Sequence, residues 1–344
     1  YNGDTWTALL NSVAFDRSTI MDRDGDTGIQ SEASPDEDRI RMDIDGEEVL
    51  QISTNAGNYT QFEMPNSHSS ILLGDDAGET LTSGSSNIII GDDAAELTPS
   101  SAQNVIIGSD ASRNASNGGQ SIVIGYQAAE NSANNNQSTI IGYQAGENAD
   151  QITNNMLIGR RAGRNMGTGG GNVVIGTEAG HNLDGASSNV IIGPQANRSG
   201  EGGSNNVILG SNAGEQNEGE NNIMLGENAG EQNLGDGNIY LGRQAGANNP
   251  NGSDNIAIGD NTGSNNPDGT NNIYLGRDAG RNDISSNNIV IGRAAGEDGT
   301  GGDGNIIMGY HAANQSIPGG GSVVIGDEAA ETAHVYAANV VIGA

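Results

Sequence analysis

A short apolar motif recurs along most of this chain. A triplet of mostly aliphatic residues followed by glycine repeats from Gly74 to Gly343, at intervals of 16 or 17 residues. The segments between triplets are rich in Asn, Gly, Ser, Asp and Glu, which are residues that form turns. A constant period of this length indicates that the chain is built from stacked structural repeats.

Each triplet predicts a short β-strand, because β-branched residues bounded by Asn and Gly favour an extended backbone. A unit of 16 or 17 residues is too short for a strand, a helix and two connections, but it suffices for one coil of two short strands and two turns. We therefore predict an all-β fold in which residues 63–344 form a parallel β-solenoid, or β-roll. With coils spaced by about 4.8 Å, seventeen repeats would make a rod of roughly 80 Å.

Three positions of the unit are nearly constant, and each has a structural interpretation. The residue four places before the glycine is Asn or Ser, which predicts ladders of side-chain amides between stacked coils. The glycine itself predicts a backbone conformation closed to other residues, or a close approach of the next coil. Ala three places later predicts a thin point of the coil. Examples of these positions are Asn87, Asn104, Asn272, Gly91, Gly108, Gly125 and Ala279.

The middle residue of the triplet is apolar in every copy. Alternate side chains of a strand point to opposite faces, so we expect the first and third residues to fill the coil and the middle one to face outward. A single chain would then expose a long apolar stripe, which predicts an interface between identical chains, most simply a homotrimer. The expected interface residues are Leu72, Ile89, Ile106, Val123, Ile140, Leu157, Val174, Ile191, Ile208, Met224, Tyr240, Ala257, Tyr274, Val290, Ile307, Val324 and Val341.

Residues 1–62 carry no copy of the repeat and predict a small β-rich module. Apolar and charged residues alternate around Asp45-Gly46, which predicts a β-hairpin near residues 39–53. Further upstream, Asp22, Asp24, Asp26 and Glu32 resemble a calcium-binding loop, although the glycine and the final acid are displaced from EF-hand spacing. A plain turn is the alternative, and calcium is the only cofactor that the sequence suggests.

Charge and composition limit the partners and the chemistry. The net charge is −31, with 44 acidic residues, 13 basic ones and no Cys. Such a surface repels nucleic acids and anionic membranes, and no apolar run has the length of a membrane span. The histidines, His68, His181, His311 and His334, share no ligand spacing. We therefore predict a protein that is not an enzyme.

Two recurring surface features have a second interpretation. The acidic pairs Asp75-Asp76 and Asp92-Asp93 predict solvated turns, or else a row of weak cation sites. The tyrosines that follow a repeat glycine, such as Tyr126, predict surface decoration of a scaffold, or else contacts with sugars.

The repeat resembles a known family. Asn-Ile-Tyr-Leu-Gly-Arg-Asp-Ala-Gly at residues 272–280 is similar to the head repeats of bacterial trimeric autotransporter adhesins, which implies a trimeric parallel β-roll over residues 70–343. The units here are longer than those of that family and add the Ala-Gly step.

The amino-terminal segment resembles bacteriophage tail-fibre modules. The resemblance rests on Tyr1-Asn-Gly-Asp-Thr-Trp6 and, in order, on Asp24-Gly-Asp-Thr, Ser34-Pro-Asp-Glu-Asp and Asp45-Gly46. It implies the shaft of a virion appendage, with a host receptor bound through a part outside this chain. A bacterial surface adhesin or extracellular filament is one alternative, and a monomeric ligand-binding solenoid is another.

Overall fold

The computed structural model describes residues 19–21, 28–31, 39–44, 47–54, 60–63, 69–115, 118–298, 302–315, 319–332 and 337–343. Over these residues the chain is all-β and contains no helix. It divides into two compact units, residues 1–71 with 84–87, and residues 72–83 with 88–344.

The first unit is a five-stranded antiparallel sheet whose strands follow one another in chain order. Its strands are β1 (Thr19–Met21), β2 (Gly28–Ser31), β3 (Arg39–Ile44), β4 (Glu47–Thr54) and β5 (Thr60–Glu63). Strands β3 and β4 are the hairpin that the sequence predicts, with an irregularity in register between Met42 and Asp43. The calcium candidates Asp22, Asp24, Asp26 and Glu32, like Tyr1–Trp6, lie outside the described residues.

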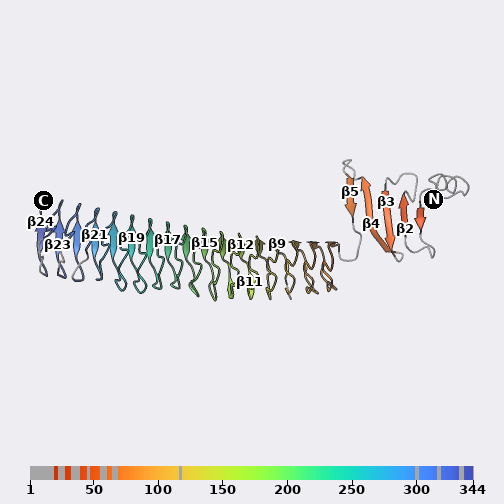
Figure 1. The fold of residues 1–344 in the computed structure, drawn as a ribbon, viewed down its shortest axis with the longest axis horizontal. Helices are drawn as coiled ribbons and strands as arrows, with labels where there is room; N and C mark the ends of the chain where they lie inside the picture. Colours follow the sequence, from red (N-terminus) through yellow and green to blue (C-terminus); the bar gives the residue numbers. More distant parts are fainter. Residues whose placement is uncertain are drawn as a thin grey trace, which may run out of the picture. The chain divides into compact units, whose positions relative to one another are not determined.

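The second unit is the predicted parallel β-solenoid (Figure 1). Each triplet forms a three-residue strand, and each strand from β7 onward pairs in parallel, without a register shift, with the strand one repeat away, as Val190–Ile192 does with Val207–Leu209. The repeat strands are β6 (Ile71–Leu73), β7 (Ile88–Ile90), β8 (Val105–Ile107), β9 (Ile122–Ile124), β10 (Thr139–Ile141), β12 (Met156–Ile158), β14 (Val173–Ile175), β15 (Val190–Ile192), β16 (Val207–Leu209), β17 (Ile223–Leu225), β18 (Ile239–Leu241), β19 (Ile256–Ile258), β20 (Ile273–Leu275), β21 (Ile289–Ile291), β22 (Ile306–Met308), β23 (Val323–Ile325) and β24 (Val340–Ile342).

The second strand expected in every coil is mostly missing from the described coils. A second parallel ladder forms between β11 (Gln151–Thr153) and β13 (Thr168–Gly170), and isolated bridges extend it locally. Elsewhere the segment after the repeat glycine is a run of turns in which left-handed residues alternate, such as Glu178 (φ 58°) and Gly180 (φ 53°). Left-handed residues cannot extend a strand, so this part of the coil curves back instead.

The repeat glycine satisfies both expectations made for it. Gly91 has φ +138°, and a Cβ built there would lie 2.5 Å from the carbonyl carbon of Gly108. Gly108 stands in the same relation to Gly125, and the contact recurs along the stack. Any side chain at this position would push neighbouring coils apart.

The buried asparagines join adjacent coils in both directions. Asn189 donates its backbone N–H to Oδ1 of Asn172 at 2.9 Å and its Nδ2 to the carbonyl of Gly203 at 2.8 Å, while its own Oδ1 accepts the N–H of Asn206 at 2.8 Å. In the same way, Asn104 Oδ1 accepts the backbone N–H of Ser121, and Asn272 Oδ1 accepts that of Asn288. The predicted ladder therefore exists, but its main partners are backbone groups; Asn87 is buried at the same position.

The predicted direction of the triplet side chains was wrong. The middle residues, from Ile89 to Val324, are at most 2% exposed within a single chain and form its core, together with the buried alanines such as Ala279. Only the end copies, Leu72 and Val341, are partly open. The alternation was predicted correctly, but the turns place Ala and Gly opposite the middle residue, so that residue fills the coil. The middle residues from Ile89 to Val324 are therefore core residues and not the surface residues that were expected.

Candidate functional site: an apolar stripe on the outer face of the coils

The first and third residues of each triplet point away from the coil interior, because the middle residue points into it. They form two parallel rows along the outer face of the sheet, here called the outer stripe. The rows contain Ile, Val, Leu and Met in every repeat strand, which excludes β11 and β13, with Thr139 as their one polar member. Their side chains are half-buried or exposed, for instance Ile122 at 40% and Ile258 at 39%.

The uniform composition of the outer stripe is unusual for a surface in contact with water. A sheet with one solvated face normally alternates apolar and polar residues. Here 44 acidic residues are available to the chain, yet none occupies either row. Apolar patches that extend along a whole face in this way mark sites of association.

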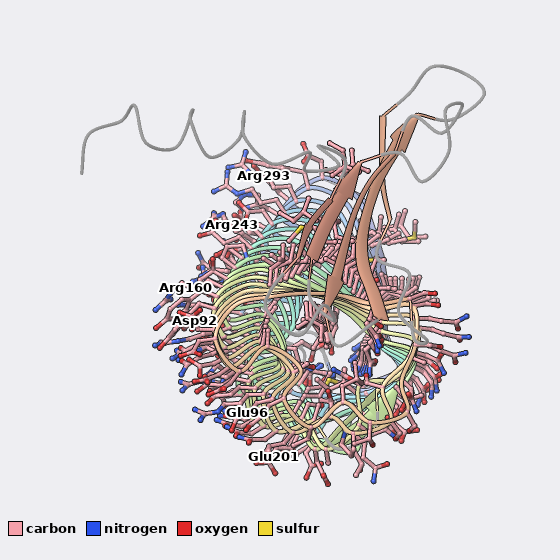
Figure 2. All side chains as sticks on the ribbon, turned by 90° about the vertical axis from the view of Figure 1, so that its right-hand side faces the viewer. Asp92, Glu96, Arg160, Glu201, Arg243 and Arg293 are labelled. Carbon is pink, nitrogen blue, oxygen red and sulfur yellow. The ribbon has the colours of Figure 1, made fainter. Side chains whose placement is uncertain are left out.

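Charged residues occupy other faces of the coil. Viewed along the solenoid axis, the side chains of Asp92, Glu96, Arg160, Glu201, Arg243 and Arg293 point outward from the coil (Figure 2). Many of the arginines pair with acids one repeat away, as Arg113 does with Glu96 and Arg164 with Glu147, both at 2.6 Å. These cross-coil ion pairs offset part of the repulsion between stacked acidic residues.

Some acidic repulsion remains between coils. Burial raises the pKa of the Glu130 carboxyl, and the charges of Asp110 and Glu147 raise it further. The pKa of Glu231 is raised for the same reasons, with Glu215 as the neighbouring charge. Repulsion between these acidic side chains of adjacent coils therefore destabilises the stack.

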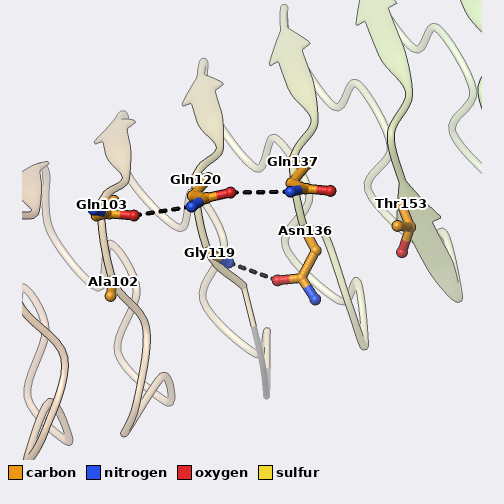
Figure 3. A pocket seen from close by; sticks show the side chains of 7 residues that line it. All are labelled: Ala102, Gln103, Gly119, Gln120, Asn136, Gln137 and Thr153. Carbon is orange, nitrogen blue, oxygen red and sulfur yellow. Dashed lines mark hydrogen bonds between the residues drawn. The ribbon is translucent and has the colours of Figure 1, made fainter.

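A shallow groove lies beside the start of strands β8 to β10 (Figure 3). Its volume is about 400 Å³, and three of its lining residues form a ladder in which Gln137 Nε2 donates to Gln120 at 3.0 Å and Gln120 Nε2 donates to Gln103 at 3.0 Å. Asn136 accepts the backbone N–H of Gly119 at 2.7 Å. The lining carries no charged side chain, and its polar side chains are the amides of the Gln and Asn residues and the hydroxyl of Thr153, which can donate and accept hydrogen bonds.

Exposed aromatic rings occur at scattered places on the solenoid. Tyr126 and Tyr143 stack with their ring centroids 5.6 Å apart. Tyr310 lies against His311, and the guanidinium of Arg293 lies 5.7 Å from its ring centroid. Each aromatic group is confined to one or two coils, whereas the outer stripe runs through all of them.

The buried tyrosines inside the coil have polar partners for their hydroxyls. Tyr274 donates its hydroxyl to Oδ2 of Asp283 at 2.9 Å, and Ser285 donates to Oδ1 of the same carboxylate at 2.6 Å. Asn249 donates its Nδ2 to the hydroxyl of Tyr240 at 2.7 Å. Burial raises the pKa of both tyrosines, so their hydroxyls stay protonated and act as structural hydrogen-bond groups.

The sequence candidates for chemistry do not come together. His181 contacts Asn182 and His311 lies 3.4 Å from Glu331, while His68 and His334 fall outside the described residues. The described residues contain no group of three or more His, Asp or Glu side chains that could hold a metal. They also contain no helix long and apolar enough to cross a membrane.

The sequence pattern alone did not predict the outer stripe, because all three triplet residues are apolar in nearly every copy. A signal in the sequence could have assigned the faces. Tyr240 and Tyr274 occupy middle positions, and the residues after the neighbouring alanines are then glycines, such as Gly246 and Gly280. A Cβ at Gly246 would lie 2.5 Å from the Tyr240 ring, so these glycines make room for a large side chain inside the coil.

Comparisons of the chain with protein-family models, curated proteins and solved structures find no match.

Proposed function

We propose that this chain is the structural shaft of a phage tail fibre or a related virion appendage, which holds a host-recognition part away from the particle. The observation that carries the proposal is the uninterrupted parallel stack of three-residue strands from β7 to β24. Each repeat adds about 4.8 Å of length and contacts only its neighbours. A rod built in this way spans a long distance with few residues.

The distribution of polar groups agrees with a scaffold. The recurring Asn and Gly positions of the repeat serve the stacking of one coil on the next, as Asn189 and Gly91 illustrate. The acidic outer faces keep long rods soluble and separate. The order of the tail-fibre-like motifs between Tyr1 and Gly46 supports a virion appendage over other rods.

A bacterial surface adhesin or extracellular filament is the second candidate. It is favoured by one observation, the similarity of residues 272–280 to the repeats of trimeric adhesin heads. Both candidates are extended, non-enzymatic structures outside the cell, and they differ in what the rod is attached to.

Electron microscopy tests the proposal in two steps. The purified chain should show a straight rod of roughly 80 Å. Gold-labelled antibodies against residues 88–343 should then mark appendages that project from virions. Label on bacterial envelopes would favour the adhesin, and the absence of rods would contradict both candidates.

A further inference from the structure

We infer that the outer stripe binds the outer stripe of further copies of this chain, side by side, parallel and in register. The inference deepens the proposed shaft function and rests on it, because it names the partner that covers the shaft. It assigns the interface to the first and third residues of each triplet, such as Val190 and Ile192, and not to the middle residue Ile191, which lies in the core.

The distance between successive side chains of the outer stripe indicates which partner can fit it. The two rows present a side chain at every coil, a repeat of about 4.8 Å that continues along the whole stack. Only a surface with the same repeat can match it from end to end, and a second copy of the chain has that repeat. Compact globular partners would cover a few coils and leave the remaining apolar side chains in water.

The area of the stripe suits a stable complex. A face roughly 80 Å long and about 10 Å wide offers about 800 Å² per chain, which is the area that one partner contributes to a standard protein interface. The contact would be apolar along its centre. The flanking rows are polar, with Gln103 and Gln120 on one side and Arg243 with Asp260 on the other. An apolar centre with a polar rim is the usual anatomy of an interface.

The charges also permit this partner. Two chains of net charge −31 repel one another, but the stripe is free of acidic residues, and charged side chains point outward from other faces. Association through the stripe therefore keeps the acidic rows apart and in solvent. A basic partner would be attracted to those acidic rows and would gain nothing from the stripe.

The single polar residue of the stripe sets the direction of the copies. In a parallel arrangement in register, Thr139 lies beside Thr139 of the neighbouring copy, where the hydroxyls can bond to each other. In an antiparallel arrangement it would face an aliphatic residue near the other end of the rod, such as one of strand β20. Pairing of the polar side chains favours the parallel arrangement.

Light scattering on the full chain gives the first test. We expect a mass two or three times the 35.0 kDa of one chain. The double variant Ile175→Asp with Leu209→Asp places two carboxylates in the stripe, and its dissociation constant should rise by about a thousandfold or more, which gives single chains. A matched control, Thr177→Asp with Ser211→Asp, adds the same charges to exposed positions of the same two coils and should keep the wild-type mass.

Cross-linking tests the interface without disturbing its charge. The chain contains no Cys, so Ile107→Cys introduces one thiol near one end of the stripe. A short bis-maleimide should join chains through it in a parallel assembly. An antiparallel assembly would leave this thiol far from its equivalent. Glu201→Cys, in the turns of the coil away from the stripe, should not cross-link in either case.

The two proposals fail in distinguishable ways. A wild-type mass of one chain, together with straight rods in the microscope, would overturn the interface and leave the shaft. Retention of the assembly by the double aspartate variant would also overturn the interface. A mass of one chain without rods would overturn the shaft itself.

Discussion

The middle residues of the triplets, here called the middle row, and the two outer rows of the outer stripe differ in how much their composition varies. The buried middle row varies in size from Ala257 to Tyr240, and nearby glycines compensate for the large residues. The outer rows face away from the coil, where a soluble monomer could carry any polar residue, yet they are almost uniformly Ile, Val, Leu and Met. The row that is free to vary in a monomer is the more uniform one, and this observation motivates the inferred contact between copies.

The largest expected effect comes from charge in the middle row. Ile191→Asp would place a carboxylate at a position that is 0% exposed, beside apolar neighbours one coil away on each side. A buried, unpaired charge costs several kcal/mol, so this variant should lower the thermal midpoint strongly or fail to fold. Thermal melting followed by circular dichroism measures it.

The adjacent variant completes that comparison. Ile192→Asp adds the same charge one residue away on the outer face, and the single chain should retain its β-sheet signal. Equal loss of secondary structure in both variants would contradict the assignment of the two faces.

The repeat glycine sets the spacing that keeps both rows aligned. Gly176→Ala forces a side chain into a backbone with φ +141° and brings its Cβ within 2.7 Å of the Gly193 carbonyl carbon, so we expect a loss of about 3 kcal/mol or more. Gly185→Ala is the matched control. Its φ is +67°, but open space surrounds it, so it should cost only about 1–2 kcal/mol. Chemical denaturation measures both values.

A double-mutant cycle tests why the middle row tolerates different sizes. Gly246→Ala should destabilise the wild type, because its new Cβ would lie 2.5 Å from the Tyr240 ring. The same substitution should cost less when Tyr240→Ile is also present, with a coupling of about 1–3 kcal/mol. Additive effects would mean that the glycine and the ring do not share the space inside the coil.

The smallest effect on stability is expected at Glu130, which lies outside the middle row and the outer stripe. Because the pKa of Glu130 is raised in the folded state, folding favours its protonated form, and its unfavourable contribution appears as the pH rises through that folded pKa. Glu130→Gln should therefore raise the thermal midpoint by a degree or so at pH 7 and leave it unchanged near pH 3. The group is half-buried and not fully screened by water, so high salt should reduce the difference in part.

Much of the fold could be predicted from the sequence, because stacking imposes a strict period. The strand positions, the close approach at Gly91 and the burial of Asn104 all follow from residues that recur at fixed distances. The curvature after the glycine was harder to predict. Left-handed residues there include Glu178 and Gln195, which carry no strong turn signal by themselves.

The site was predicted only in part. The sequence correctly placed an apolar face at the triplets, but a strand in which all three residues are apolar gives no indication of which side is buried. The deciding information lies outside the triplet, at Gly263 and Gly280, which leave space for the ring of Tyr274. Burial inside the coil depends on neighbours in the stack, so local alternation alone could not assign it.

Buried asparagines such as Asn189 form hydrogen bonds to the coil before and to the coil after, and this affects how the number of repeats can change. Most junctions between the described coils use the same bonds, as those of Asn172, Asn189 and Asn206 show, and at Ser138 a serine hydroxyl accepts the equivalent N–H. Removing the residues from one repeat glycine to the next brings together two surfaces that already fit. The length of the rod can therefore be altered in whole steps of about 4.8 Å, by duplication or loss of single units, without the need for any new contact.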